Sequence, residues 1–197
     1  MEDFALTSDT YYVSQNAARI LRGLFEIAMS RNWGPATSVI LSLCKSVDKR
    51  LWSFDPPLMQ FDLPVDISLK LESLPSQMSI EHIREMDDAE VGRLIRNQKM
   101  GSQLFKYANN FPLLALEAEV APITRSVLRV NLTISADFIW NDRVHGYAEP
   151  FWIWVEDAEN VDILYSEYFI MTKKRLMQPQ EIQFTIPLLR TESTVDE

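Results

Sequence analysis

The stretch SDTYYVSQNAARILRGLFEIAMSRN, residues 8–32, decides the fold of the N-terminal part of the chain. Its apolar side chains recur at the spacing that places residues on one face of an α-helix: Val13, Ala17, Ile20, Leu21, Leu24, Ile27 and Ala28. Ser8 and Asp9 are suited to cap the first turn, and Gly34 is a stop signal. The pattern predicts one long helix with a single apolar face.

The opposite face of this helix carries a polar stripe. Gln15, Arg19, Arg22 and Glu26 follow one another at spacings of four, three and four, which places them on the same side. Two interpretations are open: the solvated back of a core helix, which the spacing alone favours, or a rod that contacts a phosphate chain.

Two further segments complete a helical N-terminal half. Gly34-Pro35 starts a second helix, and the hairpin that it forms with the first gives a domain over residues 1–57. Residues 58–110 consist of short helices, with Ser79 and either Asp87 or Asp88 as caps. The segment Lys99-Met100-Gly101 is predicted as a turn, which is typical of helix-loop-helix nucleic-acid modules and also of small helical adaptors.

The pattern changes to alternation in residues 111–197. Apolar and other residues alternate in about five segments with no helix signal between them, near residues 114–120, 128–134, 152–155, 163–170 and 182–186. This spacing predicts a β-sandwich. The fold class is therefore α+β, with a domain boundary at residues 110 and 111.

Composition restricts the function. The net charge is −9, so the whole chain is a poor free-standing nucleic-acid binder. Residues 1–52 carry six Lys/Arg and five Asp/Glu, whereas residues 111–197 carry seven and fourteen. A polyanion would therefore meet the N-terminal third. The single cysteine, Cys44, fits a reducing compartment, nucleus or cytoplasm, and no apolar run has the length of a membrane span.

The residues that catalysis or cofactor binding would require are missing from the pattern. The five glycines do not form a phosphate-binding loop, and His82, His145 and Cys44 are too scattered to indicate a metal site or a nucleophilic triad. Glu156, Asp157 and Glu159 fit a solvated turn, and Trp152 and Trp154 share one face of a strand, where they would pack rather than stack on bases. We expect no enzyme activity, no cofactor and no metal.

Several segments together resemble the Sec sixty-three homology module of two-cassette RNA helicases, most closely that of the signal-cointegrator type. In chain order they are residues 11–20, 24–28, 49–52, 122–125, 140–142, 144–146 and 151–157. The resemblance implies a long helix that crosses the nucleic-acid channel beneath the motor domains, a helix-loop-helix subdomain and an immunoglobulin- or fibronectin-like sandwich. It implies nucleic-acid contacts at Gln15, Asn16, Arg19 and Arg22, and the helix-loop-helix implies a further one at Lys99.

The resemblance also implies partners: helicase motor domains in cis or in trans, single-stranded RNA or DNA, and the subunits of a helicase complex. The chain departs from the family at both ends, where preceding helices and following strands are expected, so the sandwich is predicted to be incomplete and marginally stable. Two alternatives remain open. The chain could be an adaptor that binds a partner protein through its acidic sandwich, or it could be a truncated product with no role of its own.

Overall fold

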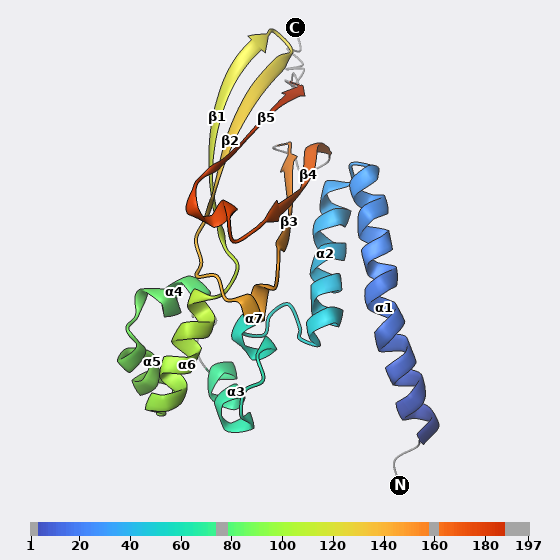
Figure 1. Cartoon of the computed structure of the whole chain (residues 1–197). Helices are drawn as coiled ribbons and strands as arrows, with labels where there is room; N and C mark the ends of the chain where they lie inside the picture. The colour runs from blue at the N-terminus through green and yellow to red at the C-terminus, as the bar shows by residue number, and fades with distance from the viewer. Residues whose placement is uncertain (1–3, 74–78, 158–161, 188–197) are drawn as a thin grey trace, which may run out of the picture. The chain divides into compact units, whose positions relative to one another are not determined.

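The computed structural model describes residues 4–73, 79–157 and 162–187. It confirms an α+β fold and divides into two compact units, residues 1–111 and 112–197 (Figure 1). In the first unit the helices are α1 (Phe4–Ser30), α2 (Gly34–Lys49), η1 (Pro57–Gln60), α3 (Val65–Glu72), α4 (Ile80–Glu85), α5 (Asp88–Leu94) and α6 (Gln98–Asn109). The second unit contains strands and two short helices. In chain order they are strands β1 (Leu114–Thr124) and β2 (Val127–Ala136), helix α7 (Asp142–His145), strands β3 (Glu149–Glu156) and β4 (Ile163–Met171), the 3₁₀ helix η2 (Arg175–Met177) and strand β5 (Gln180–Pro187).

Helix α1 is longer than predicted at its start and shorter at its end. Because it begins at Phe4, Ser8 and Asp9 lie inside the helix, and their predicted capping role is wrong. At the other end Asn32 takes the left-handed conformation, with φ of 59°. The N–H of Trp33 donates to the carbonyl of Ala28 at 3.0 Å and that of Asn32 to Met29 at 3.1 Å, which is a Schellman motif. Gly34 instead begins α2.

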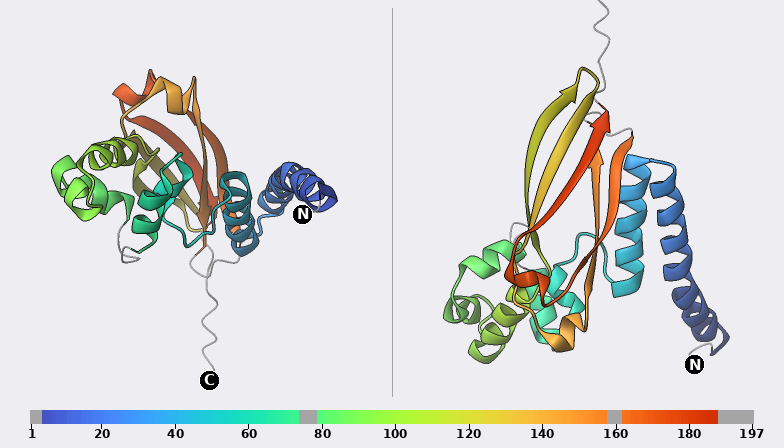
Figure 2. Two further views of the ribbon diagram at one scale, coloured as in Figure 1. Left: turned by 90° about the horizontal axis from the view of Figure 1, so that it is seen from below. Right: turned by 45° about the horizontal axis from the view of Figure 1, so that its top comes forward.

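Helices α1 and α2 lie side by side as a hairpin (Figure 2), and this hairpin buries only part of the predicted apolar face. Phe25, Ala28 and Met29 are buried, and the thiol of Cys44 is buried on α2, as expected. In contrast, four residues of the predicted face are largely exposed: Val13 (62%), Ile20 (59%), Leu24 (46%) and Ile27 (53%). The helix therefore has two apolar faces, and α2 covers one of them.

Two of the short helices, α4 and α5, are capped as predicted, whereas α3 has no side-chain cap and α6 is capped by Asn97, which was not predicted. Ser79 accepts from the N–H of His82 at 3.2 Å, and Asp87 forms a reciprocal capping box with Glu90. The predicted turn at Lys99-Met100-Gly101 is wrong, because all three residues lie within α6. Gly101 instead lies directly against Gly92 of α5, at a distance that leaves no space for a side chain.

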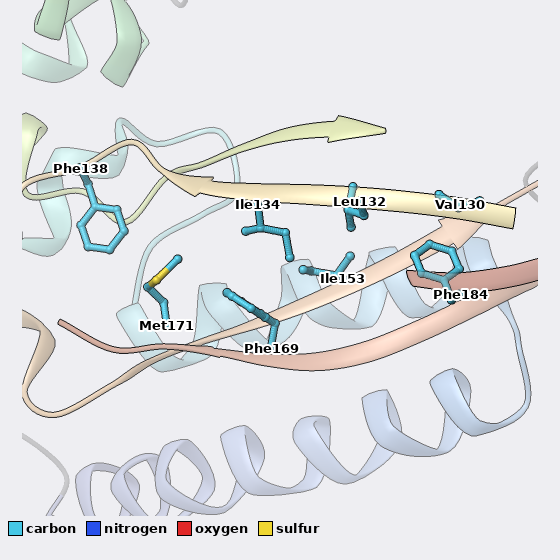
Figure 3. Packing of buried hydrophobic residues seen from close by; sticks show 8 residues of the cluster. All are labelled: Val130, Leu132, Ile134, Phe138, Ile153, Phe169, Met171 and Phe184. Atoms are coloured by element: carbon cyan, nitrogen blue, oxygen red, sulfur yellow. The ribbon is translucent and has the colours of Figure 1, made fainter. Parts of the chain in front are cut away.

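The second unit contains two antiparallel sheets with one shared core. Strand β2 lies between β1 and β5, and β3 pairs with β4. The core side chains come from β2, β3, β4, β5 and the segment after β2 (Figure 3): Val130, Leu132, Ile134, Phe138, Ile153, Phe169, Met171 and Phe184. Strand β1 contributes no fully buried side chain to this core. The expected five strands are therefore present within the described residues.

Candidate nucleic-acid interface

Helix α1 presents its polar stripe on the side that neither apolar face occupies. At 100° per residue, Gln15, Arg19 and Glu26 lie roughly a third of the circumference from the buried Phe25. All three side chains are exposed. Because α1 has 27 residues, its axis is about 40 Å long at 1.5 Å per residue. The stripe therefore lies along the middle of a long, rigid element.

Side-chain hydrogen bonds along α1 orient the polar groups. The Arg19 guanidinium donates to Oδ1 of Asn16 at 3.2 Å, and the Asn16 amide donates to the carbonyl of Tyr12 at 2.9 Å. The amide of Gln15 donates to the hydroxyl of Tyr11 at 2.6 Å. Because a guanidinium has five N–H donors, the bond to Asn16 fixes its direction and leaves donors for a phosphate. The structure thus brings Gln15, Asn16 and Arg19 together.

Arg22 has a different environment. Its guanidinium forms an ion pair with Asp48 of α2 at 3.0 Å, and Lys49 lies 3.8 Å from the same carboxylate. The Arg22 side chain remains 62% exposed. Arg22 therefore links the polar stripe of α1 to the C-terminal end of α2, a tertiary contact that helical spacing does not reveal.

Lys99 stands apart from the α1 residues. It lies in the first turn of α6, where Asn97 caps the helix by accepting from the N–H of Met100 at 3.2 Å. Its side chain is exposed. Within the described residues, no hydrogen bond or ion pair joins Lys99 to α1. The structure therefore does not assemble the five predicted residues into one cluster.

Tyr11 contacts one of the candidate residues but was not itself predicted from the sequence. Its hydroxyl positions the Gln15 amide, and 59% of the residue is exposed. The signal was the spacing of four residues between Tyr11 and Gln15, which places the two side chains one above the other on a helix. Tyr12, which is 70% exposed, supplies the carbonyl that holds Asn16.

Two ionisable groups in the second unit have shifted pKa values. The hydrogen bond from Lys173, at 2.8 Å, lowers the pKa of Asp142. Burial, together with a hydrogen bond to Glu167, raises the pKa of Tyr165 to about 12. Asp142 is paired with Lys173 at the surface, and Tyr165 is paired with Glu167 on the same strand, β4. Among the described residues no group of three potential ligands could hold a metal ion.

His145 and Glu156, two further residues weighed from the sequence, make hydrogen bonds within their own segments. His145 is buried, and Nδ1 of its ring lies 2.9 Å from the N–H of Asn141, which closes the turn at α7. Glu156 accepts from the indole of Trp154 at 2.6 Å. Glu159 lies outside the described residues. No described helix combines the length and apolar character that a membrane span requires.

Comparison with known proteins gives a consistent result. The family model described as "Sec63 Brl domain" matches residues 1–195. The RQC trigger complex helicase SLH1 of Saccharomyces cerevisiae is 44% identical over 186 residues, which are 94% of this chain and 9% of that protein. The human activating signal cointegrator 1 complex subunit 3 is 44% identical over 192 residues, 95% of this chain and 9% of that protein.

The plant relative DExH-box ATP-dependent RNA helicase DExH13 of Arabidopsis thaliana is 43% identical over 189 residues, again 95% of this chain and 9% of that protein. The chain thus spans about a tenth of the length of each of these relatives. The match over nearly the whole chain agrees with the motifs recognised in the sequence. The chain therefore belongs to the Sec63 Brl domain family and is a Sec63 module of the kind found in SLH1 and in activating signal cointegrator 1 complex subunit 3.

Proposed function

We propose that this chain is a non-catalytic module of an ATP-dependent RNA or DNA helicase, in which α1 lines the path of the single strand. The observation that carries the proposal is the exposed Arg19 guanidinium, which Asn16 orients on the polar stripe of the helix. Arginine can bind a phosphate with two parallel hydrogen bonds, and amides such as Gln15 contact sugars or base edges without sequence preference.

The rest of the chain would hold this helix in place and dock on the motor domains. The core shared by its two sheets supports an immunoglobulin- or fibronectin-like sandwich as the second unit. The capped helices α4–α6 support a helix-loop-helix subdomain between residues 58 and 110, with Lys99 as an additional phosphate contact. The names of two relatives, an RQC trigger complex helicase and an ATP-dependent RNA helicase, support a role in an RNA helicase or its complex. We expect this role in the nucleus or the cytoplasm.

The test is binding of a fluorescein-labelled oligouridine to the full chain, followed by anisotropy at low salt. Arg19→Glu is compared with Arg31→Glu, which makes the same charge change at an exposed position just after α1. Because one phosphate contact contributes about 0.7 to the salt slope for a single strand, Arg19→Glu should reduce the slope by that amount. With three or four contacts the dissociation constant should be on the order of 10⁻⁴ M. Equal binding by both variants would contradict the proposal.

A second candidate is a protein-interaction adaptor. It is favoured by the aromatic outer face of the β3–β4 sheet, where Trp152 lies against Tyr168 with ring centroids 5.0 Å apart. Tyr168 and Ile170 on the same face are 51% and 40% exposed. If this candidate is correct, Tyr168→Ser should weaken capture of a motor-domain partner, while Arg19→Glu should have no effect on that capture.

A further inference from the structure

Two large aromatic side chains project from the loop that follows α2. Trp52 is 71% exposed and Phe54 is 80% exposed. Their rings are parallel within 4°, with centroids 6.1 Å apart. Aromatic residues are normally buried for most of their surface. Two neighbouring rings with accessible faces and a common orientation therefore require an explanation.

The turn that carries the two rings is held by hydrogen bonds. The N–H of Trp52 donates to a carboxylate oxygen of Asp55 at 2.7 Å, and the N–H of Asp55 donates to the carbonyl of Trp52 at 3.1 Å. Pro56 and Pro57 follow, and their rings restrict the backbone. The backbone that carries the aromatic pair is thus restricted, which lowers the entropy that a ligand must overcome.

Cations flank the aromatic pair on its N-terminal side. Lys45, Lys49 and Arg50 are exposed, and they precede Trp52 by seven, three and two residues. The neighbouring carboxylate of Asp48 pairs with Arg22 of the α1 polar stripe at 3.0 Å and, more loosely, with Lys49 at 3.8 Å. Asp55 is occupied by the Trp52 backbone. The four cations Arg22, Lys45, Lys49 and Arg50 exceed the two carboxylates of Asp48 and Asp55, so the net charge is positive. The Arg22–Asp48 ion pair links this segment to the polar stripe of α1.

We propose that Trp52 and Phe54 form a stacking platform for unpaired bases, with Lys49 and Arg50 holding the adjacent phosphates. The proposal rests on the proposed function, because it assigns a second contact to the same strand. Projecting parallel rings next to cations are the combination that binds single strands without sequence preference, since every base has a face to stack. The adjacent cations favour a nucleic-acid strand over a protein ligand, because charged residues are depleted at the core of protein interfaces.

The experiment compares a 12-nucleotide oligothymidine with an abasic strand of the same number of phosphates. Binding to the full chain is followed at low salt by indole N–H signals in ¹H–¹⁵N spectra, in which Trp52→Phe identifies the Trp52 signal. The oligothymidine should shift that signal, and the abasic strand should not. Trp52→Ala should weaken binding of the oligothymidine by about five- to 150-fold, and Trp52→Phe should retain most of the binding.

The matched control is Trp33→Ala, which removes the exposed tryptophan at the other end of α2 and should leave binding unchanged. Far-ultraviolet circular dichroism verifies that each variant is folded. If Arg19→Glu weakens binding but Trp52→Ala does not, the platform is refuted and the proposed function stands. If the wild-type chain binds neither strand, both are refuted. If Trp52→Ala abolishes only capture of a motor-domain protein, the pair is a protein-docking site and the platform is refuted.

Discussion

Gly101→Ala tests whether the close contact between α5 and α6 determines the stability of the first unit. A Cβ atom added at Gly101 would lie 2.3 Å from the backbone N and Cα of Gly92 and 3.1 Å from the carbonyl oxygen of Asp88. Carbon atoms in contact are about 3.5–4.0 Å apart. Since backbone atoms cannot rotate away, the two helices would have to separate by more than about 1 Å.

The expected cost follows from the packing around this contact. The separation would strain or loosen Val91 and Leu104, which are 1% and 0% exposed. Overpacking of a core costs about 1–3 kcal/mol, and an immovable backbone neighbour places Gly101→Ala at the upper end. Replacing a glycine inside a helix by alanine stabilises the helix by about 1 kcal/mol, because alanine has the higher helix propensity. The net destabilisation of the first unit should therefore be about 2 kcal/mol.

Gly23→Ala is the matched control, because an added Cβ there meets nothing within 4 Å. This variant should gain up to about 1 kcal/mol from helix propensity. Because the chain folds as two units, one melting temperature would mix their transitions. Amide hydrogen exchange resolves them: α5 and α6 should lose about 30-fold in protection in Gly101→Ala. Unchanged or increased protection of these two helices would show that the close approach of the glycines does not limit the packing.

Two further predictions concern the second unit. Val120 is opposite Val130 in the register of β1 and β2, but it is 57% exposed, whereas Ile134 is 0% exposed. In urea unfolding, Val120→Ala should therefore lower the free energy of unfolding by less than about 0.5 kcal/mol, and Ile134→Ala should lower it by about 2–5 kcal/mol. Equal losses would contradict the difference in burial. The pKa of Tyr165, about 12, lies above its ordinary value of 10, so its contribution to stability is complete below pH 10 and is lost as the pH rises from 10 to 12. Tyrosinate absorbance should show one late-titrating group that Tyr165→Phe removes, and an unchanged titration curve would contradict the shift.

Local spacing predicted the fold class and the number of strands, because hydrophobic periodicity reports which side of an element is apolar. It also identified Ser79 as a cap and limited the next cap to Asp87 or Asp88, since a capping bond joins residues three apart. It failed at Asn32 and Gly101. Glycine is the usual left-handed residue after a helix, but asparagine tolerates that conformation. A glycine inside a helix can instead mark a close helix contact, which only the partner helix reveals.

The candidate interface shows the same limit. Spacing placed Gln15 and Arg19 on one face, and the resemblance added Asn16, whose bond to Arg19 the structure supplies. Spacing could not show that Arg22 pairs with Asp48, because the two residues are 26 positions apart. It also could not show that Trp52 and Phe54 are parallel and exposed, since that depends on the turn closed by Asp55.

The distribution of residues around α1 bears on the choice between a solvated back and a strand-contacting rod. A surface helix normally has one apolar stripe and charged or polar residues over the rest of its circumference. In α1 a second apolar stripe, which includes Ile20 and Leu24, replaces half of that polar surface. Between Gln15 and Glu26 the polar residues lie within the remaining third, where a hydrogen bond from Arg19 to Asn16 orients the guanidinium. Solubility alone requires neither the confinement nor the orientation, whereas contact with a continuous strand benefits from both.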